Sequence, residues 1–442
     1  MLNHPYEIHE NDREQIARRL GLTLGEFDRL VDSSNKAYDT IYETGPFYGR
    51  DEIKEPTFRI TAEPVFLPKK SQKQFELLGG DLLAVGKALH NLPEVYKDKL
   101  SEKVDYKIPP TWRIDAILDE NGQIKMNELE GVDSASALMV AEQLAYGIQT
   151  MDQSTAALLV PTIKAMALPS GDGKFKIAVL RAYLEGNPHT SNAKRFVELL
   201  EKLSKKSLKI DLLDGEQVRA GKIKPDWNQY HGVINETLLS SKALSRLGIR
   251  EKQIISSGNF NAIGNKGVFS LIFDENLKDF WEKEIGSDKL GRLQKILIPS
   301  DFIETQEQLV DARKAGKVVK VSWADNMVLL NRSKGVAIPE GDLEQSSDER
   351  WEQLGDLLKE GVRLISQEYV KPSRIKAFLR KRGTTLEPVE WYNRVCVKYV
   401  VNGDANDEKT MSVTPTAIEV TLGPDVIPAG RQCAFTAGSF RE

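Results

Sequence analysis

The chain contains 442 residues, 40% of them hydrophobic and 29% charged, so it can build a large core and is not disordered as a whole. Its 61 Lys and Arg against 65 Asp and Glu give a net charge of −4, which argues against a dedicated nucleic-acid-binding protein. Two cysteines are too few for a disulfide framework, and no apolar run is long enough to span a membrane. We therefore expect a cytoplasmic α/β protein that binds neither nucleic acid nor membranes.

The first 170 residues are predicted to be mainly helical, with one hairpin. Residues 1–100 form a helical N-terminal region, because apolar residues recur there at the three-to-four spacing of amphipathic helices. Within residues 101–170, Pro109-Pro110 breaks the helical pattern. A hairpin and a long helical stretch at 135–167 follow it. This second segment is predicted to be the first part of the core.

Residues 171–260 are predicted to form a small doubly wound α/β domain. Strands alternate there with helices: the strands at 176–182, 209–213 and 231–235, and the helices at 191–205 and 238–247. Residues 261–442 are predicted to complete the core. Its helices are expected at 268–283, 304–315 and 347–361, and its strands at 317–323, 335–338, 363–369, 393–401 and 411–420.

The hairpin between residues 111 and 133 carries an unusual set of charges. Asn121-Gly122, flanked by two strand-like runs, predicts a two-residue turn. Such a turn places Asp115 opposite Glu128 and Arg113 opposite Glu130. Because side chains alternate along a strand, all four project from one face of the hairpin.

Two carboxylates directly across a β-ladder repel each other. A third carboxylate and an arginine beside them indicate that a divalent cation and phosphate oxygens supply the missing charge. Two other interpretations stay open at this point. The face can be a solvated surface with one Arg–Glu pair, or paired carboxylates can perform acid/base hydrolysis.

Two lysines are the next candidates for phosphate binding. Lys266 ends a glycine-containing segment, 258–266, whose spacing does not match a P-loop, and no dinucleotide-binding glycine motif follows a strand. Lys320 lies inside the apolar strand 318–323, where a lysine is at an edge, extends its amine to the surface, or contacts a ligand phosphate. For Lys266 the alternative is an ordinary solvated lysine.

In their order along the chain, several short motifs resemble those of one family. They are Arg113-Ile-Asp115, Glu128-Leu-Glu130, Asp133-Ser-Ala-Ser136, Asn265-Lys266, Val319-Lys320, Lys334-Gly-Val336 and Gln367-Glu-Tyr-Val370. This order resembles circularly permuted ATP-grasp ligases of the glutathione synthetase and glutathionylspermidine synthetase type. The resemblance covers roughly residues 105–442.

The resemblance implies an ATP-grasp fold in which residues 171–260 are an inserted small α/β domain of the substrate-binding type and residues 261–442 form the ATP-grasp lid and the rest of the core. It also implies ATP and Mg²⁺ as cofactors. It implies that Asp115, Glu128 and Glu130 hold Mg²⁺, and that Arg113 acts in catalysis at the transferred phosphate or acyl phosphate. Nucleotide-binding positions would be Lys266, Lys320, Lys334, Gln367, Glu368, Val370 and Arg394.

Two positions depart from the family pattern. Glu130 stands where the family has a metal-binding asparagine, which adds a negative charge to the site. The glycine-rich run expected after the second lysine is replaced by residues 322–327, in which Asp325 or Asn326 is a candidate for the missing metal ligand.

The resemblance implies a carboxylate–amine ligase that acts through an acyl phosphate, with a small-molecule carboxylate and an amine as substrates. An ATP-grasp phosphotransferase is the second interpretation. A non-catalytic nucleotide-binding or interaction protein that retains the fold is the third. The sequence leaves open whether the chain forms homo-oligomers.

Overall fold

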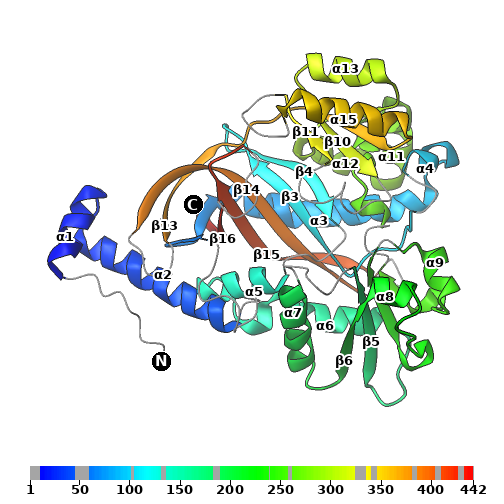
Figure 1. Ribbon diagram of the computed structural model, residues 1–442, viewed down its shortest axis with the longest axis horizontal. Coiled ribbons are helices and arrows are strands. Elements are labelled where there is room, and N and C mark those ends of the chain that lie inside the picture. Colours follow the sequence, from blue (N-terminus) through cyan, green and yellow to red (C-terminus); the bar gives the residue numbers. More distant parts are fainter. Residues whose placement is uncertain are drawn as a thin grey trace.

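The computed structural model describes residues 10–44, 59–100, 104–130, 136–182, 190–237, 239–256, 261–323, 335–339, 346–380, 386–403, 410–426 and 433–441. These residues form a mixed α/β molecule in which helices pack around one large and two smaller sheets (Figure 1). None of the helices in these ranges combines the length and apolar character needed to cross a bilayer.

The large sheet runs through the middle of the molecule. Its strands are β1 (Arg59–Thr61), β2 (Val65–Pro68), β3 (Thr111–Leu118), β4 (Ile124–Glu130), β13 (Arg374–Arg380), β14 (Glu387–Asn402), β15 (Ser412–Gly423) and β16 (Ala434–Arg441). Their order is β13-β1-β16-β15-β14-β3-β4, with β2 also paired to β16. Because β13 pairs with β14 as well as β1, five of these strands form a closed ring, and the β3–β4 hairpin extends from it.

The two faces of the large sheet have different chemistry. One face is apolar: Trp112 and Tyr399 are fully buried there, and the Tyr399 hydroxyl donates to the Phe75 carbonyl of α3 (Lys69–Ala88) at 2.8 Å. α3 approaches closely because Gly79 lacks a Cβ, which would lie 2.8 Å from the Tyr399 ring. The opposite face carries charged residues and is covered by α5 (Ser136–Ala145), whose Met139 packs between β14 and β15.

The remaining N-terminal helices support these layers. α1 (Glu10–Arg19) leads into α2 (Leu24–Thr44), which packs against α5 through Ala37 and Ile41. α6 (Thr155–Met166) packs beside β14, and α4 (Glu94–Leu100) follows α3.

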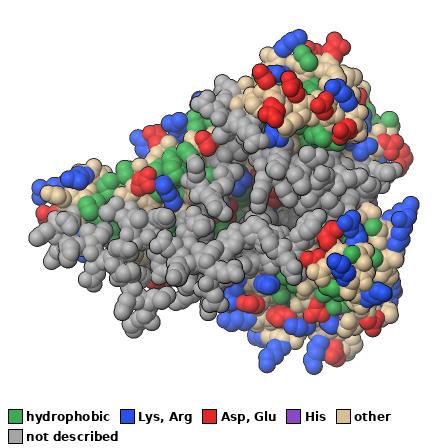
Figure 2. All heavy atoms as spheres, viewed as in Figure 1, with side chains coloured by type: hydrophobic (Ala, Val, Ile, Leu, Met, Phe, Trp, Pro, Cys, Tyr) green, Lys and Arg blue, Asp and Glu red, His purple; other side chains and the backbone are tan. Residues whose placement is uncertain are grey.

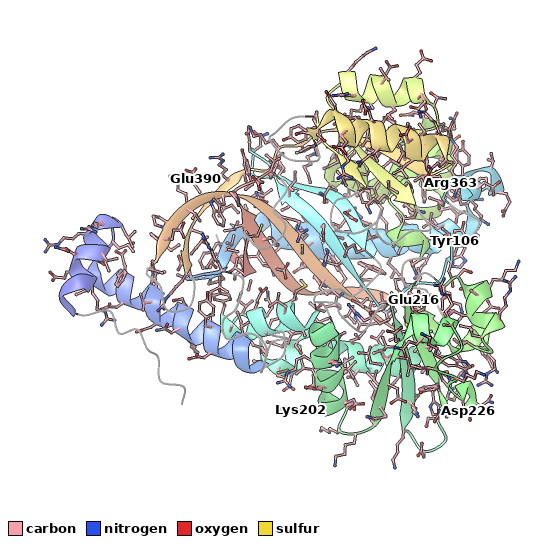
Figure 3. The ribbon with its side chains drawn as sticks, in the orientation of Figure 1. Tyr106, Lys202, Glu216, Asp226, Arg363 and Glu390 are labelled. Carbon is pink, nitrogen blue, oxygen red and sulfur yellow. The ribbon has the colours of Figure 1, made fainter. Side chains whose placement is uncertain are left out.

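The first small sheet is parallel, with the order β6-β5-β7-β8. Its strands are β5 (Phe175–Arg181), β6 (Leu208–Asp214), β7 (Gly232–Glu236) and β8 (Ile254–Ser256), and its helices are α7 (Thr190–Leu203), α8 (Gly215–Arg219) and α9 (Ser241–Arg246). The alternating strands and helices predicted for this part of the chain are confirmed. In Figure 3, Lys202, Glu216 and Asp226 mark this unit at the lower right.

The second small sheet is antiparallel, with the order β11-β10-β12-β9. Its strands are β9 (Ser300–Ile303), β10 (Val318–Trp323), β11 (Val336–Ala337) and β12 (Arg363–Gln367), with α13 (Gln306–Lys314) and α15 (Asp348–Lys359) packed on it. Three helices precede it in the chain: α10 (Gly267–Phe273), α11 (Lys278–Ile285) and α12 (Ser287–Ile296). Figure 2 shows side chains of both charge signs mixed over the two lobes that these small sheets form.

Some predicted elements are wrong. Two short strands, β1 and β2, lie in the region predicted to be helical, and β9, β13 and β16 were not predicted. The predicted helix at 135–167 is divided into α5 and α6, because Gly147 adopts a φ of 66° and Ser154 begins a new helix by accepting a hydrogen bond from the Ala157 amide.

Candidate functional site

The β3–β4 hairpin brings the four predicted charged residues together. Arg113 pairs with Glu130 and Asp115 pairs with Glu128, as the sequence predicts. Arg113 is 8% exposed and Asp115 is 4% exposed, so the interpretation of this face as a solvated surface is wrong. Arg113 and Asp115 are therefore part of the interior of the molecule, and Glu128 and Glu130 are half-buried beside them.

The turn that produces this register differs from the predicted one. Asp119 and Gln123 close a three-residue loop through the Gln123 carbonyl and the Asp119 amide, and Gly122 adopts a φ of 67°. This loop shifts the pairing by one residue relative to a two-residue turn. A bulge at Asn127 then restores the predicted register, because this extra residue lies between the Met126 and Glu128 pairings.

Asp115 is held by two arginines. Arg113 Nε donates to Asp115 Oδ1 at 2.7 Å and Nη2 donates to Oδ2 at 3.1 Å, while Arg394 Nη1 lies 3.8 Å from Oδ2. Burial alone would raise the pKa of Asp115, but the two guanidiniums outweigh it and hold that pKa below its usual value. The carboxylate of Asp115 is thus kept ionised inside the protein.

Lys266 and Lys320 converge on the same hairpin from separate elements. Lys266 Nζ, at the start of α10, lies 2.7 Å from Glu128 Oε1. Lys320 Nζ, on β10, donates to the Asn127 carbonyl at 3.0 Å. Burial would raise the pKa of Glu128, but the two ammonium groups lower it overall, whereas burial lowers the pKa of Lys320 to about 8.

The alternative interpretations of both lysines are wrong. Lys320 is 6% exposed, and β10 pairs with β11 on one side and β12 on the other, so this lysine is neither at an edge nor extended to the surface. The Lys266 side chain is mostly buried and ion-paired to Glu128.

A row of four side chains crosses four adjacent strands on this face. Glu128, Asp115, Cys396 and Glu419 stand directly opposite one another on β4, β3, β14 and β15. We call these four residues the cross-strand row. Neighbours in such a row are about 5 Å apart between Cβ atoms, so the row forms one continuous polar strip across the sheet.

The end of the row at Glu419 was missed by sequence analysis. Glu142 lies on α5, which covers this face, and burial together with the nearby Glu419 carboxyl raises the pKa of Glu142 well above its usual value. Burial also raises the pKa of Glu419 and of the Cys396 thiol. A raised thiol pKa keeps Cys396 protonated, which argues against a nucleophilic role.

The other predicted nucleotide-binding residues are distributed around β12. Gln367 ends this strand, lies on the same face of the antiparallel sheet as Lys320, and donates to Ser300 Oγ at 3.1 Å. Glu368 is exposed and Val370 is half-buried in the segment that follows. Lys334 lies outside the described residues, as do Asp325 and Asn326.

The predicted metal ligands do not form a metal site as the side chains stand. Within the described ranges, no group of three or more His, Cys, Asp or Glu residues is placed to hold a metal ion. Arg113 holds Asp115 and also contacts Glu130 Oε2 at 2.8 Å, and Lys266 holds Glu128. In this structure Arg113 and Lys266 supply positive charge to these three carboxylates, and their assignment to Mg²⁺ stays a prediction.

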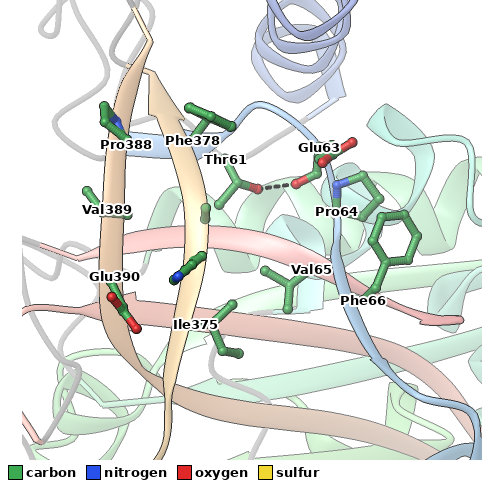
Figure 4. Close-up of a pocket in the computed structure, with 12 residues that line it drawn as sticks. Thr61, Glu63, Pro64, Val65, Phe66, Ile375, Phe378, Pro388, Val389 and Glu390 are labelled. Carbon is green, nitrogen blue, oxygen red and sulfur yellow. Dashed lines mark hydrogen bonds between the residues drawn. The ribbon is translucent and has the colours of Figure 1, made fainter. Parts of the chain in front are cut away.

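A cavity of about 620 Å³ lies elsewhere, between the β1–β2 segment and the β13–β14 pair (Figure 4). Its wall is mainly apolar, formed by Pro64, Val65, Phe66, Ile375, Ala377, Phe378, Pro388 and Val389, with Thr61, Glu63, Lys376 and Glu390 also lining it. None of the predicted site residues lines this cavity, so the candidate site is the polar face of the large sheet.

Comparison with known proteins identifies the fold. No family model matches the chain, and no curated protein sequence matches it. A solved structure of a glutathione synthetase-like effector from Globodera pallida, in its apo form, matches 94% of this chain and 98% of its own, with a TM-score of 0.57 and 12% identity.

A second structure, a candidate gamma-glutamylcysteine synthetase from Methylobacillus flagellatus, matches 80% of this chain and 84% of its own, with a TM-score of 0.41 and 11% identity. The likeness to the effector extends over nearly the whole length of both chains, at a sequence identity that carries information on fold only. The chain therefore has a glutathione synthetase-like fold.

Proposed function

We propose that the protein is an ATP-dependent carboxylate–amine ligase that acts through an acyl phosphate. One observation carries the proposal: Lys266 and Lys320 converge from two separate elements on the hairpin that carries Arg113. Three cations around one hairpin suit the phosphate oxygens of ATP, and catalysis of phosphoryl transfer consists mainly of positioning and charge stabilisation.

The cations are preorganised for this task. Without nucleotide, Glu128 and the Asn127 carbonyl hold the two lysine amines close to the hairpin. Phosphate oxygens would compete with these acceptors for the amines. ATP binding would then exchange one hydrogen-bond acceptor for another and would need little rearrangement of the lysine side chains. Gln367, on the same sheet face as Lys320, would lie beside the nucleotide.

The proposed chemistry has two steps. A substrate carboxylate oxygen bonds to the γ-phosphorus of ATP while the bond from that phosphorus to the β–γ bridging oxygen breaks, which releases ADP. The amine nitrogen then bonds to the acyl carbon, phosphate leaves with the carboxylate oxygen, and the amine loses a proton. Arg113 would stabilise the charge on the transferred phosphate, and Mg²⁺ would enter as the counter-ion that ATP carries, with no step assigned to it.

The test is calorimetry with Mg-ATP on the wild type, Lys320→Ala and the surface control Lys314→Ala. We expect wild type and control to bind alike and Lys320→Ala to bind at least about tenfold more weakly, because a charge-assisted hydrogen bond is worth about 1.5–3 kcal/mol. No Mg-ATP binding by the wild type, or equal binding by all three proteins, would contradict the proposal.

A non-catalytic nucleotide-binding or interaction protein is the second candidate, because each predicted metal ligand is already paired with a cation. ADP release separates the candidates. A ligase releases ADP and phosphate only with both carboxylate and amine present, a phosphotransferase needs no amine, and a non-catalytic protein releases neither.

A further inference from the structure

The cross-strand row ends at two carboxyls that the nucleotide chemistry does not use. Glu419 is the last residue of the row on β15. Glu142 lies on α5 between Met139, which packs against Cys396 and Ala417, and Gln143, which bonds to the Ile418 carbonyl next to Glu419. Glu142 is 0% exposed and Glu419 is 3% exposed, so bulk water cannot solvate a charge on either carboxyl. An acidic pair in this position needs a physical explanation.

Most oxygens of this pair have no hydrogen-bond partner. Both carboxyl oxygens of Glu142 and Oε2 of Glu419 are buried without one, and Glu419 Oε1 accepts only a long 3.5 Å hydrogen bond from Thr421. Within the described part of the chain, no ion pair involves either residue. Buried polar groups are nearly always paired in native proteins, and an unpaired buried carboxyl is costly.

The position of Glu142 is fixed by its neighbours on α5. Gln143 Nε2 donates to the Ile418 carbonyl of β15, and the Tyr146 hydroxyl donates to the Thr61 carbonyl of β1. Met139, one turn earlier, packs against Cys396 and Ala417. Anchors before and after Glu142 therefore hold its side chain against the sheet.

Within the described residues, neither nearby arginine forms an ion pair with Glu142 or Glu419, although Nε of Arg394 is buried without a hydrogen-bond partner. Arg113 and Arg394 influence Glu419 electrostatically, but Arg113 makes its close contacts with Asp115 and Glu130, and Arg394 faces Asp115. The row is thus divided, with cations around Glu128 and Asp115 and uncompensated acid at Glu419 and Glu142.

We infer that Glu142 and Glu419 form a subsite for a primary ammonium group of a substrate. An ammonium carries one positive charge and three N–H donors, which suit carboxyl oxygens that approach from a helix above and a strand below. The inference rests on the proposed function, because it assigns to one substrate an ammonium group that is distinct from the attacking amine and lies at the end of the row opposite the phosphate-binding cations, about 15 Å from Glu128.

The competing explanation is that the two carboxyls share a proton and bind nothing. The test therefore uses a minimal cation, n-propylammonium chloride, with n-propanol as its uncharged match, at constant ionic strength and without nucleotide. Calorimetry measures binding to the wild type, Glu142→Gln, Glu419→Gln and the control Glu390→Gln, an exposed residue on β14. Glutamine retains the shape of the side chain and removes its charge.

We expect the wild type and Glu390→Gln to bind the ammonium probe but not the alcohol, and each of the other variants to bind it at least about tenfold more weakly. Equal affinity for ammonium and alcohol, or unchanged affinity in both glutamine variants, would overturn the inference. If the variants do not fold, absence of selective binding to the wild type alone overturns it. Because no ATP is present, ammonium binding without Mg-ATP binding would reject only the ligase proposal.

Discussion

The two ends of the cross-strand row are built from the same residue types but balance their charge differently. At the hairpin end, Lys266 and Arg113 pair with Glu128 and Asp115 within 2.7 Å. At the other end, Glu142 and Glu419 are more deeply buried and have no such partner. Burial alone therefore does not determine whether these acids are ionised. The cations that reach them do, and each cation comes from a different part of the chain.

The largest effect should come from removing the arginine at the compensated end. Arg113→Met leaves Asp115 buried without its bidentate partner, so we expect the free energy of unfolding to fall by about 3–5 kcal/mol. Urea denaturation measures it, with exposed Arg374→Met as the control. A loss below about 1 kcal/mol would mean that Arg394 alone compensates Asp115.

Removing Lys266 should cost less, because Glu128 is partly exposed. We expect Lys266→Met to lower the free energy of unfolding by about 1–3 kcal/mol and Glu128→Gln to relieve most of that loss in the double variant. A double-mutant cycle from urea denaturation checks the coupling. Additive effects of the two substitutions would show that the ion pair contributes no stability of its own.

At the end of the row near Glu142 and Glu419, removing a charge should not lower the free energy of unfolding at pH 7. The raised pKa of Glu142, caused by burial and by Glu419, means that folding favours its protonated form. The contribution of Glu142 to stability should therefore be greatest below the unfolded pKa of 4.5 and decline as pH rises above it. Glu142→Gln should flatten this decline and leave the protein as stable or more stable at pH 7, by about 1 kcal/mol or less. A steeper pH dependence in this variant would contradict the assignment.

The smallest effect is expected at Glu130, whose side chain is 31% exposed and pairs with Arg113. Burial and the neighbouring Asp115 and Glu128 carboxylates raise its pKa to about 7 despite that arginine. Glu130→Asn should cost about 0–1 kcal/mol, as partly exposed ion pairs do. The Mg²⁺ titration midpoint of ATP binding should not move. A shifted midpoint would show that Glu130 is a metal ligand, as the family resemblance implies.

The four hairpin residues could be predicted from the sequence because their cross-strand pairing is set by a short stretch of chain. Alternation along two strands joined by a short loop determines that Arg113, Asp115, Glu128 and Glu130 share a face. The three-residue loop and the bulge at Asn127 each shift the register by one residue, and the two shifts cancel. Only the family resemblance assigned Lys266 and Lys320 to one nucleotide site, because no local sequence pattern links β10 to the hairpin.

The acidic pair could not be found in this way. Glu142 lies in a helix and Glu419 in a strand, each in an ordinary amphipathic context. Their burial depends on α5 docking onto β15, which joins residues about 275 positions apart. Short strands such as β1 were missed for the same reason, because their pairing partners lie far away in the chain.

The closed ring of strands also constrains the order of folding. β16 lies between β1 and β15, and Thr61 bonds to Thr436 across 375 positions. During synthesis, β1 and β15 must keep unpaired edges until residues 434–441 have emerged from the ribosome. Contacts this distant in sequence form slowly, and exposed strand edges promote association with other chains. The ring of strands therefore cannot close until residues 434–441 are available to pair with β1 and β15.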